Sequence, residues 1–234
     1  MAHWRSDSLD WRTGHYLVNM RAVILISGNG SNLQSLIDNA IKIDLEICAV
    51  ISNNRDAFGL KRAELANIET FFVDPNLFTS NEEFDQKIIT IIKELDIKLI
   101  VLAGYMRILS ASFINHFSGK ILNIHPSLLP KFPGLNTHKK AIDAQEKYHG
   151  ASVHFVTEEL DGGPVISQEI VEVDSSDSEY SLAQKVLEKE HILYPKVIHW
   201  YTQNKLKLIN KDCIRLMEKS YEENCPSIFK SYSY

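Results

Sequence analysis

The sequence predicts an α/β fold: a doubly wound, mostly parallel sheet with an antiparallel hairpin at one edge. Short apolar strand candidates alternate with amphipathic helix candidates from Arg21 to His125, which is typical of a parallel sheet covered on both faces. Beyond Gly150 the alternation stops, and two extended segments joined by a short glycine-containing loop predict the hairpin. We therefore expect a single domain over residues 20–210.

The strand candidates are recognised by uninterrupted apolar runs, as expected for strands buried on both faces. They lie at residues 22–27, 45–52, 70–73, 98–103 and 120–125, and the hairpin strands lie at 151–157 and 164–173. A weaker strand is predicted at 205–209. The tail over residues 211–234 shows no clear period, and no structure is predicted for it.

The helix candidates show apolar residues at helical spacing. They cover residues 31–40, 60–66 and 81–95, a short segment after Ser110, and a long stretch from about 178 to 201 that contains Pro195. Ser31 and Ser80 are each followed three residues later by Gln or Glu, which predicts that both serines cap their helices.

The composition excludes several classes of function. The 25 Lys and Arg residues are outnumbered by 30 Asp and Glu, and the net charge of −5 gives no basic surface for nucleic acid or an anionic membrane. The 3 cysteines have no metal-binding or disulfide spacing, which favours a reducing cytoplasm and no metal. No apolar run reaches membrane-spanning length. Residues 1–19 lack the apolar core of a signal peptide, so we expect an N-terminal extension or a remnant of the expression vector before Met20.

A glycine-containing loop, SGNGSN at residues 27–32, connects the first strand to the first helix. At this position in an α/β sheet, backbone N–H groups and a helix N-terminus favour an anion. Leu33 stands where a dinucleotide fingerprint needs a third glycine, so we expect a site for one phosphate rather than a pyrophosphate. The alternative is a tight turn that serves only packing.

Asn123 and His125 are two residues apart at the end of a buried strand, so their side chains lie on the same face of the sheet. The run PSLLPKFPG then prevents helix formation, and Leu129–Pro130 is a candidate cis peptide bond. Such a histidine can act as a proton donor, and the asparagine amide can donate to an oxyanion. The alternative is a histidine that is merely hydrogen-bonded at a strand end.

Asp161 stands in the hairpin loop LDGGP, where Asp-Gly alone is explained as a favoured turn. A role in catalysis requires its carboxylate to reach His125, where charge pairing would raise the pKa of the imidazole. His154 lies mid-strand as a possible cleft-lining residue or a structural histidine. The remaining histidines show no metal-ligand spacing, so no metal is expected.

Three segments occur in order: SGNGSN, then LAGYMRIL with NIHPSLLPKFPG, then GASVHFVTEELDGGPVI. Together they closely resemble the phosphoribosylglycinamide formyltransferase family, folate-dependent enzymes of purine synthesis, over about residues 20–210. The resemblance implies a formyltransferase-type sheet and direct transfer of the formyl group of 10-formyltetrahydrofolate to the amine of glycinamide ribonucleotide. It implies small-molecule substrates only and leaves the oligomeric state open.

The resemblance also implies roles for individual residues. Asn123 and His125 would stabilise the tetrahedral oxyanion, and Asp161 would keep His125 protonated and help to move a proton. The expected ligands of the ribonucleotide phosphate and ribose are Gly30, Ser31, Asn32 and Glu190. The expected folate-binding residues are Met106, Arg107, Ile108, Leu109, Asn123, Thr157, Glu158, Glu159, Leu160 and Asp161.

One departure and four alternatives accompany this resemblance. Asn81 stands where some members of the family carry an arginine that is expected to contact the folate glutamate tail. Arg107 could instead be a helix-capping surface cation. Methionyl-tRNA formyltransferase would need a further RNA-binding domain, and formyltetrahydrofolate hydrolase would need an N-terminal regulatory domain. A non-catalytic nucleotide-binding module is disfavoured by Leu33.

Overall fold

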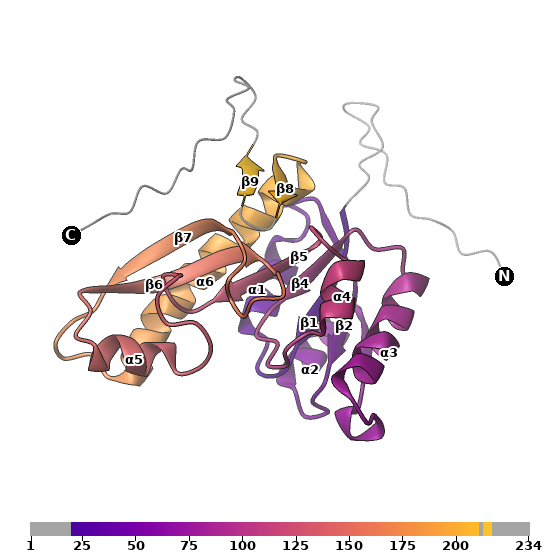
Figure 1. Cartoon of the computed structure of the whole chain (residues 1–234), viewed down its shortest axis with the longest axis horizontal. Coiled ribbons are helices and arrows are strands. Elements are labelled where there is room, and N and C mark those ends of the chain that lie inside the picture. The colour runs from indigo at the N-terminus through magenta and orange to yellow at the C-terminus, as the bar shows by residue number, and fades with distance from the viewer. Residues whose placement is uncertain (1–19, 211–212, 217–234) are drawn as a thin grey trace.

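The fold was determined as a computed structural model that describes residues 20–210 and 213–216. The predicted extension over residues 1–19 lies outside the described residues, as do residues 211–212 and 217–234. The predicted fold class is confirmed: a seven-stranded sheet with the order β3-β2-β1-β4-β5-β6-β7 carries helices on both faces (Figure 1).

The strands of the main sheet agree closely with the apolar runs in the sequence. They are β1 (Met20–Ile26), β2 (Leu45–Ser52), β3 (Glu69–Phe72), β4 (Leu99–Leu102), β5 (Ile121–His125), β6 (Tyr148–Phe155) and β7 (Val165–Glu172). The first five are parallel to one another, whereas β6 runs antiparallel to both β5 and β7, which confirms the edge hairpin. The chain runs outward from β1 to β3 and then returns to β4, so a topological switch point lies between β1 and β4.

The helices form two layers because side chains along each strand alternate between the two faces. In β1, Ile24 faces a core shared with α1 (Ser31–Asn39) and α6 (Glu179–Thr202). Its neighbour Val23 faces a second core shared with α3 (Asn81–Glu94) and α4 (Ala111–His116). The first layer also contains α2 (Phe58–Leu65) and α5 (Thr137–Asp143), and a short 3-10 helix, η1, spans Pro75–Leu77.

Helix α6 continues through Pro195, although a proline cannot donate to the carbonyl four residues earlier. That carbonyl belongs to His191, and it accepts a hydrogen bond from Ser35 Oγ of α1 at 2.8 Å. The acceptor freed by the proline therefore joins α6 to α1.

Three local predictions were wrong or incomplete. Ser31 does not cap α1, because residue 30 must turn in the left-handed region (φ 74°), so Gly30 takes the cap position and Ser31 lies inside the helix. Helix α5 was missed; it follows Asn136, which also has a left-handed conformation and makes no side-chain cap, so the usual start signal is absent. Beyond the predicted weak strand β8 (Leu206–Asn210), an antiparallel partner β9 (Cys213–Leu216) was also missed.

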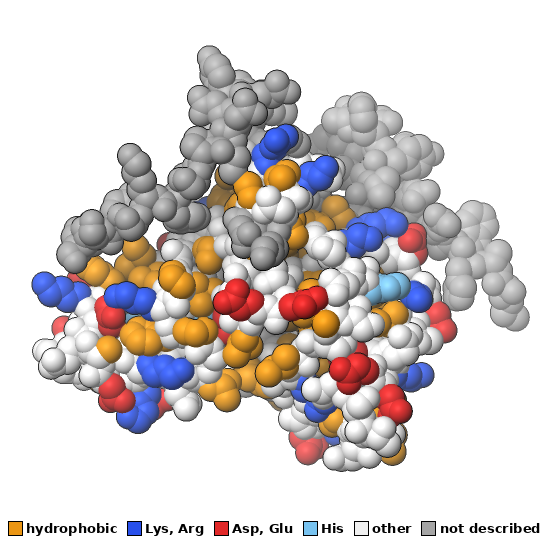
Figure 2. Space-filling model, in the orientation of Figure 1, with side chains coloured by type: hydrophobic (Ala, Val, Ile, Leu, Met, Phe, Trp, Pro, Cys, Tyr) orange, Lys and Arg blue, Asp and Glu red, His pale blue; other side chains and the backbone are white. Residues whose placement is uncertain are grey.

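The surface of the described residues shows mixed charge. On the face drawn in Figure 2, basic and acidic side chains are scattered among one another, with apolar side chains exposed between them. Within residues 20–210 and 213–216, none of the helices has the length and apolar character needed to cross a bilayer.

Candidate active site

One cleft of about 910 Å³ opens at the carboxyl ends of β1, β4 and β5, beside the switch point. Every site residue predicted from the sequence lines this cleft, although these residues come from segments far apart in the chain. The lining includes Gly30, Ser31, Asn32, Met106, Arg107, Ile108, Leu109, Asn123, His125, His154, Thr157, Glu158, Glu159, Leu160, Asp161 and Glu190. Their functional roles remain predictions; their convergence is a structural fact.

The glycine loop (residues 27–32) is positioned from two sides. Ser27 Oγ accepts a hydrogen bond from the Met106 backbone N–H at 2.8 Å and donates to Asn53 Oδ1 at 2.6 Å. Gly30 packs against α2, where a Cβ on residue 30 would lie 2.6 Å from the α carbon of Gly59. Residue 30 must therefore be glycine both for its left-handed backbone and for this close contact.

Glu190 reaches the glycine loop from α6. Its Oε2 accepts a hydrogen bond from Asn32 Nδ2 at 2.7 Å, across 158 residues of sequence. Burial raises the pKa of the Glu190 carboxyl to about 7, and the Asn32 hydrogen bond only partly opposes this. Asn32 Oδ1 is also buried and has no hydrogen-bond partner among the described residues. The Asn32 amide therefore keeps one free acceptor next to the Glu190 carboxyl.

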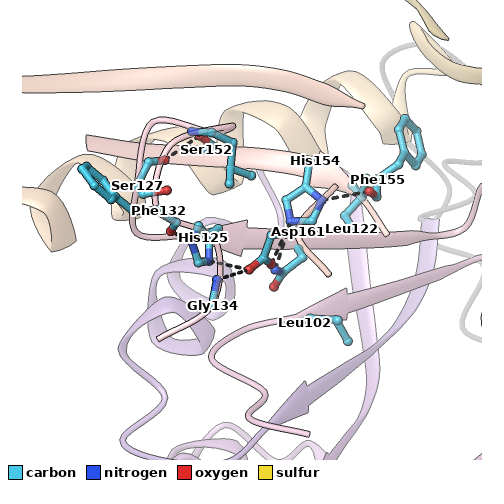
Figure 3. Close-up of polar contacts among 12 residues, drawn as sticks. Leu102, Leu122, His125, Ser127, Phe132, Gly134, Ser152, His154, Phe155 and Asp161 are labelled. Atoms are coloured by element: carbon cyan, nitrogen blue, oxygen red, sulfur yellow. Dashed lines mark hydrogen bonds and ion pairs between the residues drawn. The ribbon is translucent and has the colours of Figure 1, made fainter. Parts of the chain in front are cut away.

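His125 and Asp161 meet in the cleft, as the proposed chemistry requires (Figure 3). Nδ1 of His125 lies 3.4 Å from Oδ2 of Asp161, and both side chains are more than 90% buried. The same carboxylate oxygen accepts a hydrogen bond from the backbone N–H of Gly134 at 2.8 Å. Asp161 itself has a left-handed backbone (φ 51°) in the hairpin loop, and that turn aims its carboxylate inward.

The direction of the pKa shift at His125 corrects the expectation from sequence. Burial lowers the pKa of the imidazole, and it outweighs the upward effects of the Phe132 carbonyl and of the Asp161 charge. At Asp161 burial raises the pKa, but the hydrogen bonds and the neighbouring histidines outweigh it, so the pKa of this carboxyl is lowered. Asp161 is therefore held ionised, while His125 binds a proton less readily than a histidine in water.

The hydrogen-bond network nevertheless assigns the protons in the cleft. His125 Nε2 donates to the Phe132 carbonyl oxygen at 2.9 Å, because a carbonyl can only accept. A proton bound at Nδ1 would then lie between the imidazole and the carboxylate of Asp161. Both ring nitrogens already have partners, and a substrate oxygen must share or displace one of them.

His154 was expected to be either a cleft-lining residue or a structural histidine, and it is both: it lines the cleft, and both of its ring nitrogens are hydrogen-bonded. Its Nδ1 donates to the Phe155 carbonyl oxygen at 2.9 Å, which leaves Nε2 to accept from Asn123 Nδ2 at 3.1 Å. His154 Nε2 also lies 3.7 Å from Asp161 Oδ1. The histidine thus fixes the orientation of the Asn123 amide and places it beside Asp161.

The proline loop (residues 126–134) brings Phe132 and Gly134 to His125 and Asp161. The Leu129–Pro130 peptide bond is cis, as predicted. Ser152 Oγ donates to the Ser127 carbonyl at 2.6 Å and accepts from the Leu129 N–H at 3.0 Å. Gln168 Nε2 donates to both the Leu129 carbonyl (2.9 Å) and Ser152 Oγ (2.7 Å). The loop is therefore held by side chains of β6 and β7 as well as by its prolines.

The residues nominated for folate form the other rim of the cleft. Met106 and Ile108 are each 66% exposed, and Leu160 is 55% exposed, which is unusual for apolar side chains beside a cleft. Arg107 Nη2 donates to Asn81 Oδ1 at 2.5 Å, and its guanidinium lies 4.4 Å from the ring centre of Phe84. Asn81, the departure noted in the sequence, thus binds Arg107 at this rim.

Several residues that line the cleft were not predicted from the sequence. Tyr105 lies inside the LAGYMRIL segment, yet its buried hydroxyl, which has no partner among the described residues, gave no signal in the sequence. Thr137 and His138 were overlooked because helix α5 was not predicted. The backbone N–H of Gly134 has no side-chain signature at all.

Comparisons with known proteins agree with this geometry. A model of the family "Formyl transferase" matches residues 20–198. The chain is 50% identical over 191 residues to phosphoribosylglycinamide formyltransferase of Escherichia coli (strain K12), which covers 81% of this chain and 90% of that protein. The Haemophilus influenzae protein of the same name is 47% identical over 191 residues, covering 80% of this chain and 90% of its own.

Solved structures give the same result. Phosphoribosylglycinamide formyltransferase from Coxiella burnetii superposes with a TM-score of 0.80 at 46% identity, over 84% of this chain and 93% of that one. Glycinamide ribonucleotide transformylase 1 from Symbiobacterium toebii superposes with a TM-score of 0.84 at 34% identity, over 92% and 100% of the two chains. The chain belongs to the formyl transferase family and, within it, groups with the phosphoribosylglycinamide formyltransferases.

Proposed function

We propose that this protein transfers the formyl group of 10-formyltetrahydrofolate to the amine of glycinamide ribonucleotide, producing formylglycinamide ribonucleotide and tetrahydrofolate in purine biosynthesis. The observation that carries the proposal is the meeting of His125 and Asp161, at 3.4 Å, beside Asn123 in one cleft. These groups suit acyl transfer because they combine an amide donor, an imidazole and a buried carboxylate.

The ribonucleotide would lie at the glycine-loop end of the cleft. Its phosphate would accept hydrogen bonds from Gly30, Ser31 and Asn32 at the N-terminus of α1. Because Ser31 does not cap the helix, its hydroxyl is not committed to a cap hydrogen bond. The ribose hydroxyls would pair with Glu190, the carboxylate that Asn32 holds at this end.

Formyl transfer would proceed by direct attack of the amine nitrogen on the formyl carbon, which turns the carbonyl oxygen into an oxyanion. Asn123 and His125 would stabilise that oxyanion. The negative charge of the oxyanion would in turn favour the protonated imidazole of His125 in the tetrahedral state, where it would act as a proton donor. Asp161 would accept a proton from the attacking amine, through water, and return it to N10 of the folate as the carbon–nitrogen bond breaks. The attacking nitrogen thus loses one proton and the leaving nitrogen gains one.

The folate would extend along Met106, Arg107, Ile108 and Leu109 on one side and residues 157–161 on the other. The exposed apolar side chains of Met106, Ile108 and Leu160 provide contact area for a flat pterin and its linker. Arg107, held by Asn81, would provide a cation for the carboxylate tail. The proposal includes a cytoplasmic location, small-molecule substrates and no metal.

The proposal is tested by following the absorbance change on formyl transfer from 10-formyltetrahydrofolate, with and without glycinamide ribonucleotide. Turnover that requires the ribonucleotide is the expected result. Deformylation without the ribonucleotide would instead indicate a hydrolase, and tight nucleotide binding without any turnover would indicate a binding module.

A further inference from the structure

Helix α2 forms a platform behind the glycine loop. The Gly59 N–H donates to the Gly28 carbonyl at 3.1 Å, and Gly59 lies against Gly30 so closely that neither position has room for a Cβ. On Gly59 a Cβ would meet Ile26 Cδ1 at 2.4 Å. The first turn of α2 therefore touches the backbone of the loop directly, and a side chain further along the helix can reach the same loop.

Arg62 of α2 makes that contact. Its Nε donates to the Asn29 carbonyl oxygen and its Nη2 to Asn29 Oδ1, both at 2.9 Å, so the planar guanidinium grips the loop with two parallel hydrogen bonds. Its Nη1 donates to Gln34 Oε1 of α1 at 3.2 Å, and the guanidinium carbon lies 4.9 Å from the ring centre of Phe58. One side chain thus joins the loop, α1 and α2.

Within the part of the chain that the structure describes, the charge of Arg62 has no acidic partner. The three groups that accept its hydrogen bonds are all uncharged amides, and among residues 20–210 and 213–216 no carboxylate lies within ion-pair distance of it. Its Cδ would be 3.6 Å from a Cβ at position 30, directly behind the loop, yet Arg62 does not line the cleft. The guanidinium of Arg62 therefore contacts the loop without lining the cleft.

We propose that Arg62 is a positioning residue for the anion site: it fixes the shape of the glycine loop through Asn29 and adds positive potential for the substrate phosphate. This inference rests on the proposed binding of that phosphate at residues 30–32. The positive end of the α1 dipole faces the same place, so the helix and the cation act in the same direction. Arg62 would strengthen phosphate binding without touching the phosphate.

The first test measures inorganic phosphate binding to the intact chain, from the backbone amide shifts of Gly30, Ser31 and Asn32 in two-dimensional NMR. We expect Arg62→Met to weaken phosphate binding roughly fivefold or more at low ionic strength, with the difference shrinking as salt is added. Arg62→Lys keeps the positive charge but loses the planar guanidinium that makes the paired hydrogen bonds. Its phosphate affinity should therefore lie between those of the wild type and Arg62→Met. Arg55→Met is the matched control. It removes an exposed arginine that lies in the segment just before α2 and stacks on Phe72 of β3.

The outcomes of this measurement separate the inference from the proposed function. If phosphate moves none of the three amides in the wild-type protein, the proposed anion site is wrong. If it moves them equally in the wild type and in Arg62→Met, or if Arg55→Met weakens binding as much, the site stands and the role of Arg62 is rejected.

The second test uses the catalytic reaction. With glycinamide ribonucleotide, Arg62→Met should raise KM for the ribonucleotide while leaving kcat and the KM for folate nearly unchanged. With the riboside, which lacks the phosphate, wild type and variant should have the same kcat/KM. An equal loss with both substrates would show that Arg62 only supports the fold.

Discussion

The cleft is bounded by two loops that follow parallel strands and use their backbones differently. The glycine loop after β1 has backbone N–H groups at the helix N-terminus that would contact the ligand themselves. The proline loop after β5 turns its backbone groups toward side chains: the Phe132 carbonyl binds His125, and the Gly134 N–H binds Asp161. Damage to the first loop should therefore weaken binding, whereas damage to the second should slow turnover.

The two loops are also held in place by different means. Close packing and a cation hold the glycine loop, through Gly59 and Arg62 of α2. A neutral hydrogen-bond cluster of Ser152 and Gln168 holds the proline loop. The difference fits the task of each loop, since positive potential would help an anion site but would make a neighbouring imidazole harder to protonate.

The largest effect is expected at the side chain that the proline loop positions. Replacing His125 by Ala should lower kcat by about a thousandfold, because it removes both a proton donor and an oxyanion contact. KM for either substrate should change little, since those contacts strengthen only in the transition state. Steady-state kinetics give both values, and a KM increase as large as the kcat loss would make His125 a binding residue.

Glu190→Gln should change stability in a pH-dependent way. The raised pKa, about 7 against 4.5, means that the folded protein binds this proton more tightly than the unfolded chain does. The stabilisation that comes from this bound proton is complete below pH 4.5 and is lost as the pH rises through 7. At pH 8 the variant should be more stable than the wild type by on the order of 3 kcal/mol, and at pH 4.5 the two should be nearly equal. Urea unfolding across this range checks the sign, and a difference independent of pH would contradict it.

Gly30→Ala should damage binding on the glycine-loop side. The added methyl group would collide with Gly59, and the left-handed backbone would be strained, together costing about 2 kcal/mol. We expect a rise of about thirtyfold in KM for the ribonucleotide and a smaller change in kcat. Gly119→Ala is the control for strain alone, because its φ is 73° but its nearest neighbour is 3.7 Å away. A Gly30→Ala variant that lost kcat instead of affinity would break the distinction between the loops.

The smallest effect is expected at Gln168, which does not line the cleft. In Gln168→Glu a carboxylate would face the Leu129 carbonyl oxygen without a proton to donate, so the proline loop should loosen and kcat should fall roughly tenfold. Losing the Phe132 contact should lower the pKa of His125 further, which imidazole nitrogen NMR can measure. A lower kcat with an unchanged His125 titration would point to a general loss of folding, as would an equal effect of Ile170→Ala on the same strand.

Sequence patterns were sufficient to predict those features of the structure that depend on neighbouring residues in the chain. Apolar runs located the strands of the main sheet, and the spacing of Asn123 and His125 at a strand end identified the edge of the sheet where the cleft opens. The patterns failed where distant groups decide the structure. The Asp-Gly turn at Asp161 looks the same whether or not its carboxylate reaches an imidazole, and the sign of the His125 pKa shift depends on burial. Arg62 and Gln168 act on loops far away in the sequence and belong to no motif.

A proline within a long helix is usually regarded as a defect, but here it serves as an attachment point. Along the 24 residues of α6 almost every main-chain acceptor is consumed by the helix itself, so its other hydrogen bonds to neighbouring elements are made by side chains such as Tyr194 and Thr202. Pro195 leaves one acceptor free, and Ser35 binds it. Since that acceptor belongs to the residue next to Glu190, the missing N–H provides a link to α1 directly beside the carboxyl group that binds Asn32.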